Sequence, residues 1–285
     1  MALLPLISSN MNLRDLAKIA ASMNSTDKMP VLFLGHGSPM NAIEENQFVV
    51  GFRTIAKTLP TPNAILCISA HWYTNGTKVT AMELPRTIHD FGGFPKELFE
   101  VQYPAKGSPT LAEEAQKALS PISVELDEKW GLDHGAWSVI KHLFPDANIP
   151  VVQLSIDYTQ PAQYHYDLAQ SLNELRSKGV LIIGSGNIVH NLRMVDFANF
   201  DRDNYGYDWA IEAREFINSH LLNGNYLPLI NYQKQSKSLQ LAIPTPEHYL
   251  PLIYTLGLQQ KGENIALFND KLMAGSLSMT SLKII

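Results

Sequence analysis

The sequence has a single cysteine, no excess of basic residues and no long hydrophobic run. Cys67 is the only cysteine among 285 residues, so a disulfide within the chain is excluded. It lies in the apolar segment AILCIS, where we expect a core residue and not a reactive thiolate. The net charge is -5, and Lys and Arg are scattered, which argues against a nucleic-acid partner.

Targeting signals and several familiar catalytic motifs are also missing. No segment approaches the roughly 20 apolar residues that a membrane span requires, and the first residues do not resemble an export signal. We therefore predict a cytoplasmic protein without a membrane partner. The sequence contains no phosphate-binding GxxxxGK[ST] and no HExxH, and Ser38 does not lie in a GxSxG elbow. GSGNIV at Gly184 has only two glycines of a dinucleotide fingerprint, which gives NAD binding weak support.

The order of apolar and polar residues predicts one catalytic domain after an N-terminal extension. Residues 1–29 contain apolar residues at helical spacing, which STDKMP interrupts, so we predict a helical extension there. Residues 30–285 show no linker composition and are predicted to form a single domain.

Within residues 30–285, short apolar runs alternate with amphipathic segments. This alternation predicts an α/β fold of three layers, with a mostly parallel or mixed central sheet and helices on both faces. The predicted strands are Val31–Leu34, Ala64–Ser69, Lys78–Met82, Val151–Ile156 and Val180–Gly184. The predicted helices are Glu45–Thr58, Pro109–Leu119, Ala136–Leu143, Pro161–Lys178, Tyr207–Leu222 and Glu247–Leu256. The long loop from Thr87 to Pro109 is predicted to form a lid or wall of a functional site.

Three of the nine histidines follow predicted buried strands. His36 follows VLFLG, His71 follows AILCISA, and His190 follows VLIIGSGNIV. Ligands of open α/β sheets bind where the loops that leave the strands converge, so these three side chains are expected to meet. His248 opens a predicted helix after Pro246 and Glu247, and it could close the same site from a loop.

A metal site explains this grouping better than other histidine chemistry, because neutral imidazole is a common ligand of zinc and iron. Taken alone, His36 or His71 would be about as suited to a hydrogen bond with a backbone carbonyl. Gly35 and Gly37 flank His36, and they allow either a close approach to a ligand or an ordinary tight turn.

The remaining histidines have weaker functional interpretations. His134 lies where a loop enters a helix, so a cavity-facing role and a structural role are equally supported. His89 lies on the long loop, where it could form part of the wall of the site or belong to a plain turn. His142, His165 and His220 fall in amphipathic helices and are predicted to be surface or boundary residues.

A series of longer motifs resembles one known family. The motifs are LFLGHGSPMNAIE, SAHWYTNGTKVTAME, TIHDFGGFP, YPAKGSP, WGLDHGAWSV, VQLSID, GSGNIVHNLR, PTPEHYLPL and GSLSM. Together they resemble the 4,5-DOPA extradiol dioxygenase family of bacteria and plants, which is related to the catalytic subunit of protocatechuate 4,5-dioxygenase. The resemblance extends from about Met29 to the C-terminus.

This resemblance implies a mononuclear metal site in an α/β fold. It implies non-haem Fe(II) for activity, with Zn(II) able to occupy the same site. Matched by position, His36, His71 and His248 correspond to metal ligands, and His190 to a residue that binds the metal or acts as an acid and base. His134 corresponds to a substrate-facing histidine. In the related two-protein class of these dioxygenases, the metal ligands are two histidines and a carboxylate. Glu247 is therefore the alternative to His248 as the third ligand.

The implied reaction is extradiol cleavage of an L-DOPA-like catechol by O2, in a monomer or small homo-oligomer. In this scheme, His190 takes a proton from the substrate and later returns one, while His134 hydrogen-bonds the substrate or oxygen. Two other functions are compatible with the same residues. One is a zinc-dependent hydrolase that activates water, and the other is a catalytically silent binding protein of this fold.

Overall fold

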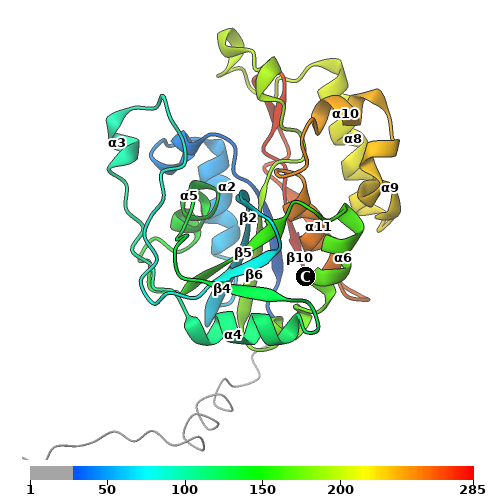
Figure 1. Cartoon of the computed structure of the whole chain (residues 1–285). Coiled ribbons are helices and arrows are strands. Elements are labelled where there is room, and N and C mark those ends of the chain that lie inside the picture. The colour runs from blue at the N-terminus through cyan, green and yellow to red at the C-terminus, as the bar shows by residue number, and fades with distance from the viewer. Residues whose placement is uncertain (1–27) are drawn as a thin grey trace, which may run out of the picture.

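A mixed eight-stranded sheet forms the centre of the protein, whose computed structural model describes residues 28–285 (Figure 1). The strand order is β4-β3-β5-β2-β6-β1-β10-β7, and β8 and β9 form a separate hairpin. The strands are β1 (Val31–Gly35), β2 (Ala64–Thr74), β3 (Thr77–Thr80), β4 (Val124–Asp127), β5 (Val151–Asp157), β6 (Val180–Gly186), β7 (Ile265–Phe268), β8 (Leu272–Met273), β9 (Leu277–Ser278) and β10 (Ser281–Ile284).

The four central strands run parallel, which determines where the functional loops meet. β2 pairs in parallel with β5 on one side and with β6 on the other, and β6 pairs in parallel with β1. The antiparallel pairs are β3 with β5, β1 with β10 and β10 with β7. The carboxyl ends of β1, β2 and β6 therefore lie at the same edge of the sheet.

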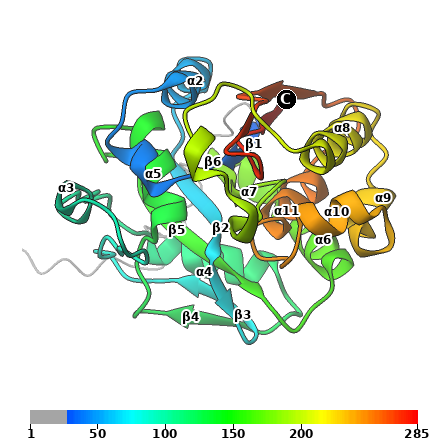
Figure 2. The ribbon, with the colours of Figure 1, turned by 90° about the horizontal axis from the view of Figure 1, so that it is seen from above.

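Helices cover both faces of the sheet, as predicted (Figure 2). They are α2 (Gln47–Ala56), α3 (Lys96–Phe99), α4 (Pro109–Ala118), α5 (His134–Leu143), α6 (Ala162–Gln170), α7 (Asn173–Arg176), α8 (Asp208–Leu222), α9 (Leu227–Ile230), α10 (Lys237–Ala242) and α11 (Leu250–Gly257). Short 3-10 turns are η1 (Pro39–Ala42), η2 (Leu192–Met194), η3 (Phe197–Asn199) and η4 (Tyr232–Lys234). One apolar core lies between the sheet and α2 and α5, and a second lies beneath α4, α6, α8, α10 and α11.

All five predicted strands are present, but five further strands were missed. The missed strands β4, β7, β8, β9 and β10 contain only two to four residues each. Strands of this length have too few alternating positions to distinguish them from loops in a sequence. The predicted helix over 161–178 is in fact two helices, α6 and α7, and the predicted helix over 247–256 begins only at Leu250.

Three other predictions have different outcomes. Cys67 is fully buried, which confirms its assignment to the core. In the described part of the chain, no helix has both the length and the apolar character needed to cross a membrane. The predicted extension over 1–29 falls almost entirely outside the described residues, and the assignment of 30–285 to one domain stays a prediction.

Candidate metal centre and active site

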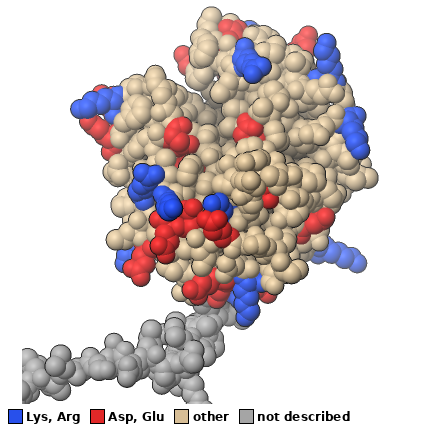
Figure 3. Space-filling view, viewed as in Figure 1, with Lys and Arg blue, Asp and Glu red and all other residues tan. Residues whose placement is uncertain are grey.

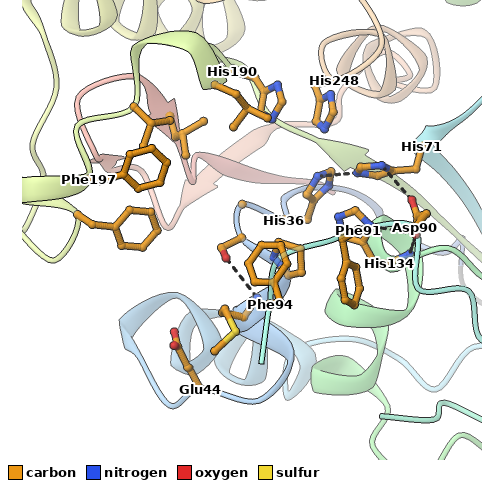
Figure 4. A pocket seen from close by; sticks show the side chains of 18 residues that line it. His36, Glu44, His71, Asp90, Phe91, Phe94, His134, His190, Phe197 and His248 are labelled. Atoms are coloured by element: carbon orange, nitrogen blue, oxygen red, sulfur yellow. Dashed lines mark hydrogen bonds and ion pairs between the residues drawn. The ribbon is translucent and has the colours of Figure 1, made fainter. Parts of the chain in front are cut away.

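Five imidazoles line the inner end of a cavity of about 590 Å³ above the sheet (Figure 4). They belong to His36, His71, His134, His190 and His248, so all five predicted site residues are brought together. The long loop from Thr87 to Pro109 contributes Asp90, Phe91 and Phe94, which confirms its prediction as a wall of the site. The rest of the lining is Gly37, Ser38, Pro39, Met40, Glu44, Leu192, Val195, Phe197, Phe200 and Leu277.

His36 directly follows β1, as predicted. Its backbone nitrogen donates to Gly186 O at 3.2 Å, which extends the pairing of β1 with β6 by one residue. The next residue, Gly37, has a φ of 61°, and a Cβ there would lie 2.3 Å from Met279 Sδ. Any side chain at Gly37 would therefore be strained by both conformation and space. Because no side chain is present, the chain turns away sharply and leaves the His36 ring facing the cavity.

His71 lies within β2 and not beyond it, which corrects the predicted end of that strand at Ser69. The register of β2 against β5 shifts between Ile68 and Tyr73, so His71 lies in an irregular stretch of the strand. Such irregularities redirect side chains near active sites. Close packing then holds the ring, because a Cβ on Gly135 would lie only 2.7 Å from His71 Cδ2.

His248 lies in the turn before α11 and not on the helix itself. Tyr249 N and Leu250 N both donate to Pro246 O, at 3.0 and 2.9 Å, which forms this turn ahead of the helix. Asn187 N donates to His248 O at 2.8 Å, so the turn is joined to the end of β6. The turn therefore brings His248 to the same edge of the sheet as His36 and His71.

Each of these three rings has a partner at its Nδ1 atom. His36 Nδ1 is 3.0 Å from Ser185 Oγ, whose own proton is donated to Gly135 O, so Ser185 accepts from His36. His71 Nδ1 is 3.1 Å from Asp90 Oδ2, and His248 Nδ1 is 3.3 Å from Glu247 Oε1. Acceptors at Nδ1 favour the tautomer in which Nε2 carries the lone pair.

The three rings converge closely enough to share one ion. A ring nitrogen of His36, of His71 and of His248 all lie within 4.8 Å of one another. His36 Nε2 and His71 Nε2 are only 3.3 Å apart, which would place two lone pairs face to face. A shared cation removes that repulsion, so the donor set fits a metal ion bound by neutral imidazoles.

Two other groups of three could also supply metal ligands. One comprises His71, Asp90 and His134, and the other comprises His190, Glu247 and His248. In the first group, Nδ1 of each imidazole already lies close to an Asp90 carboxylate oxygen, at 3.1 and 3.0 Å. Glu247 lies on the Nδ1 side of His248, where it orients the ring. The geometry thus favours His248 over Glu247 as the third ligand.

His190 and His134 lie on either side of the three converging rings. His190 stacks on His248, with centroids 3.6 Å apart, and its backbone nitrogen donates to Ala242 O. His134 is the first residue of α5, and its centroid is 3.9 Å from that of His71. Both rings therefore face the cavity next to the converging nitrogens.

Burial keeps most of these imidazoles neutral. It lowers the pKa of His36 and of His248 well below the usual value, and the neighbouring imidazoles lower both further. Burial lowers the pKa of His190 to about 4. Burial also opposes the charged form of His71, but its hydrogen bond to Asp90 and the charge of Asp133 raise its pKa overall. Neutral rings are the form that binds metals and accepts protons.

Asp90 is the main functional residue that the sequence did not reveal. Burial would raise its pKa, but hydrogen bonds with His134 and His71 hold the pKa of Asp90 well below its usual range. Asp90 Oδ1 also accepts from His134 N at 2.9 Å. It therefore positions two site histidines. An aspartate in a long loop gives no such signal in a sequence, because its partners lie on other elements.

The other histidines lie outside the cavity lining of the described residues. His89 Nε2 is 2.9 Å from Val101 O, so it stabilises the long loop. The prediction of surface or boundary positions was wrong for His142 and His165, which are both buried. Their rings find polar partners in the interior, since His142 Nε2 is 2.7 Å from Asn41 O and His165 Nδ1 is 3.0 Å from a tyrosine hydroxyl.

The surface charge shows no single dominant sign on the face drawn in Figure 3. Lys and Arg side chains lie interspersed with Asp and Glu there. The cavity, by contrast, gathers five imidazoles.

Comparison with known proteins identifies the family of this chain. Residues 30–273 match the family described as the catalytic LigB subunit of aromatic ring-opening dioxygenase. The chain is 47% identical over 264 residues to an Escherichia coli K12 protein named 4,5-DOPA dioxygenase extradiol, covering 91% of this chain and 96% of that one. It is 36% identical to the Beta vulgaris protein of the same name, covering 92% and 98% of the two chains.

A solved structure supports the same assignment. The crystal structure of an uncharacterized protein from Escherichia coli K12 superposes with a TM-score of 0.78 at 43% sequence identity. The match covers 90% of this chain and 100% of that one. The chain therefore belongs to the LigB family of aromatic ring-opening dioxygenases, and it is an extradiol dioxygenase that uses O2 and a small-molecule substrate.

Proposed function

We propose that His36, His71 and His248 bind one divalent ion through their Nε2 atoms. The ion is Fe(II) in the active enzyme, and Zn(II) can occupy the same imidazole ligands. The support comes from the three rings, which converge while an acceptor engages each Nδ1. His190 is not part of the group that His36, His71 and His248 form, so we assign it to proton transfer in preference to a fourth ligand.

The proposed substrate is a catechol that resembles L-DOPA. Relatives from Escherichia coli, Beta vulgaris and Mirabilis jalapa are all named 4,5-DOPA dioxygenase extradiol. The cavity of about 590 Å³ lies in the usual size range of small-molecule sites and has room for a substituted ring. When bound, the ion would acidify the catechol hydroxyls and supply the redox chemistry that O2 requires.

The chain's own residues would move the protons. His190 is neutral near pH 7, because burial lowers its pKa to about 4, and so its free ring nitrogen can accept a proton from a catechol hydroxyl. The same nitrogen can return that proton later in the reaction. Asp90 Oδ1 lies 3.0 Å from His134 Nδ1, so His134 Nε2 would be the ring nitrogen left for a hydrogen bond to substrate.

Access to the site would be limited by aromatic side chains. Phe91 and Phe94 form part of the wall beside His134, and the Phe91 and His134 rings meet edge to face with centroids 5.3 Å apart. A bound catechol would thus lie between imidazoles on one side and apolar rings on the other. Such a lining excludes water and strengthens the hydrogen bonds around the reacting hydroxyls.

The convergence of three imidazoles beside His190 is the observation that carries the proposal. The test is anaerobic loading with Fe(II), followed by air and a panel of catechols that includes L-DOPA. We expect O2 uptake together with a new visible absorbance, and neither with the Zn(II)-loaded protein. No O2 uptake with any catechol, despite bound iron, would refute the proposed function.

A further inference from the structure

The outer half of the cavity has a composition very different from the inner half. Its wall is formed by apolar side chains from four separate segments, which are Met40, Phe91, Phe94, Leu192, Val195, Phe197, Phe200 and Leu277. The cavity is far larger than a catechol ring needs, so a ring substituent would extend into this apolar half. The outer wall therefore contacts the part of the substrate that varies between catechols.

Glu44 is the one charged residue in that outer half, among the described residues that line the cavity. It is exposed to solvent and lies on the far side of the cavity from the imidazoles, just after η1 (Figure 4). Its backbone nitrogen donates to Met40 O at 2.9 Å, which fixes the turn that carries it. Within residues 28–285, no hydrogen bond or ion pair occupies its carboxylate, whereas neighbouring Glu45 is paired with Arg53 at 2.7 Å.

The cavity lining that the described residues form also lacks cationic side chains. Among the described residues, no Lys or Arg lines the cavity, and its only other charged side chain is Asp90. A substrate carboxylate entering the apolar half would lose water without gaining a positive partner. A substrate ammonium group would instead meet the Glu44 carboxylate. The outer half thus favours a positive or an uncharged substituent over a negative one.

We infer that Glu44 is a specificity-determining residue that selects catechols with an ammonium-bearing or uncharged side chain over catechol carboxylic acids. This inference rests on the proposed function and names the substrate class of the same site. An L-DOPA-like amino acid carries both groups, so its amine would be recognised while its carboxylate would remain toward solvent at the cavity mouth. An amine of the same length without the carboxylate would bind better.

The test compares four catechols of similar length in wild-type protein and in matched variants. They are dopamine, 4-propylcatechol, 3-(3,4-dihydroxyphenyl)propionate and L-DOPA. Binding is measured by calorimetry with the Zn(II)-loaded protein, and kcat/KM is measured by O2 uptake with the Fe(II)-loaded enzyme. The variants are E44Q and E44K, with E45Q and E45K as controls that change the net charge equally outside the cavity.

In the wild type, we expect dopamine to bind most tightly and the propionate most weakly. E44Q should reduce the preference for dopamine over 4-propylcatechol by about fivefold, the size of a solvent-accessible ion pair. E44K should reverse the order of dopamine and the propionate, while both Glu45 variants should keep the wild-type order. If E44Q and E44K also keep that order, the inference is wrong, even though the catechols are still cleaved. If the calorimetric order follows Glu44 but no catechol is cleaved, the inference holds for binding and the proposed oxygenase function fails.

Discussion

The His190 ring lies flat against the His248 ring, with centroids 3.6 Å apart and an angle of 9° between the planes. This stacking places His190 directly beside a proposed metal ligand. His190 is mostly buried, and its backbone is held at both the α10 end and β9, through Ala242 and Leu277. The arrangement separates two roles, because one ring can bind the ion while the adjacent ring transfers protons.

Replacing His190 should separate turnover from metal content. We expect His190→Ala to retain bound Fe(II) but to lose about 100-fold or more in kcat, the usual contribution of a general acid or base. His248→Ala should lose the metal itself, because it removes one of three converging ligands. Elemental analysis and O2 uptake on the same samples measure both quantities. Equal loss of metal in the two variants would instead make His190 a ligand.

Asp90 should influence metal affinity although it is not a proposed ligand. Asp90→Asn keeps the shape of the side chain but removes the charge that orients His71 and His134. Such supporting carboxylates typically contribute about 10-fold to 100-fold in metal affinity. Competition with a chromogenic zinc chelator measures the change. Asp167→Asn, on the exposed side of α6, is the matched control and should leave the affinity unchanged. An Asp90→Asn affinity equal to the wild type would contradict the positioning role.

Gly135 should be intolerant of even one methyl group. Its Cβ in Gly135→Ala would lie 2.5 Å from Ser69 Oγ and 2.7 Å from His71 Cδ2, so either α5 or the His71 ring must move. We expect a loss of metal affinity together with a loss of about 1–3 kcal/mol in unfolding free energy. Chelator competition and urea unfolding test this pair of effects. Gly92→Ala, which meets no atom within 4 Å, serves as the control. Wild-type metal affinity in Gly135→Ala would show that the site accommodates the methyl group.

His165 should make the stability of the metal-free protein depend on pH. Burial lowers its pKa to about 4, whereas an exposed histidine in the unfolded chain titrates near 6.5. Because the unfolded chain takes up the proton first, the stability that His165 contributes is present above pH 6.5 and is lost as the pH falls toward 4. Between pH 7 and pH 5, the loss from this residue amounts to about 2 kcal/mol.

The measurement compares the wild type with His165→Gln in urea unfolding at pH 5, 6 and 7. The other histidines are common to both proteins, so the difference in slope isolates His165. We expect the variant to be the less pH-dependent of the two. Identical slopes would mean that the folded protein accommodates a charged His165.

The sequence by itself determined that the centre of the sheet is parallel and that three site histidines follow buried strands. Long runs such as Val180–Gly184 are apolar throughout because they are buried on both faces, and this pattern requires no tertiary information. Since parallel strands direct their carboxyl ends to one edge, the expectation that His36, His71 and His190 would meet there followed from local pattern alone. The longer motifs then pointed to the family that the comparisons confirmed.

Only the tertiary structure decided which atoms face one another. Asp90 becomes a positioning residue because the long loop folds back against β2 and α5, and Glu44 becomes a cavity residue because η1 places it opposite the imidazoles. His165 illustrates the same limit, since the hydrogen-bond partner of its buried ring is Tyr254, 89 residues away. Contacts between distant segments have no local period in a sequence, so the partners of each imidazole could be known only from the folded chain.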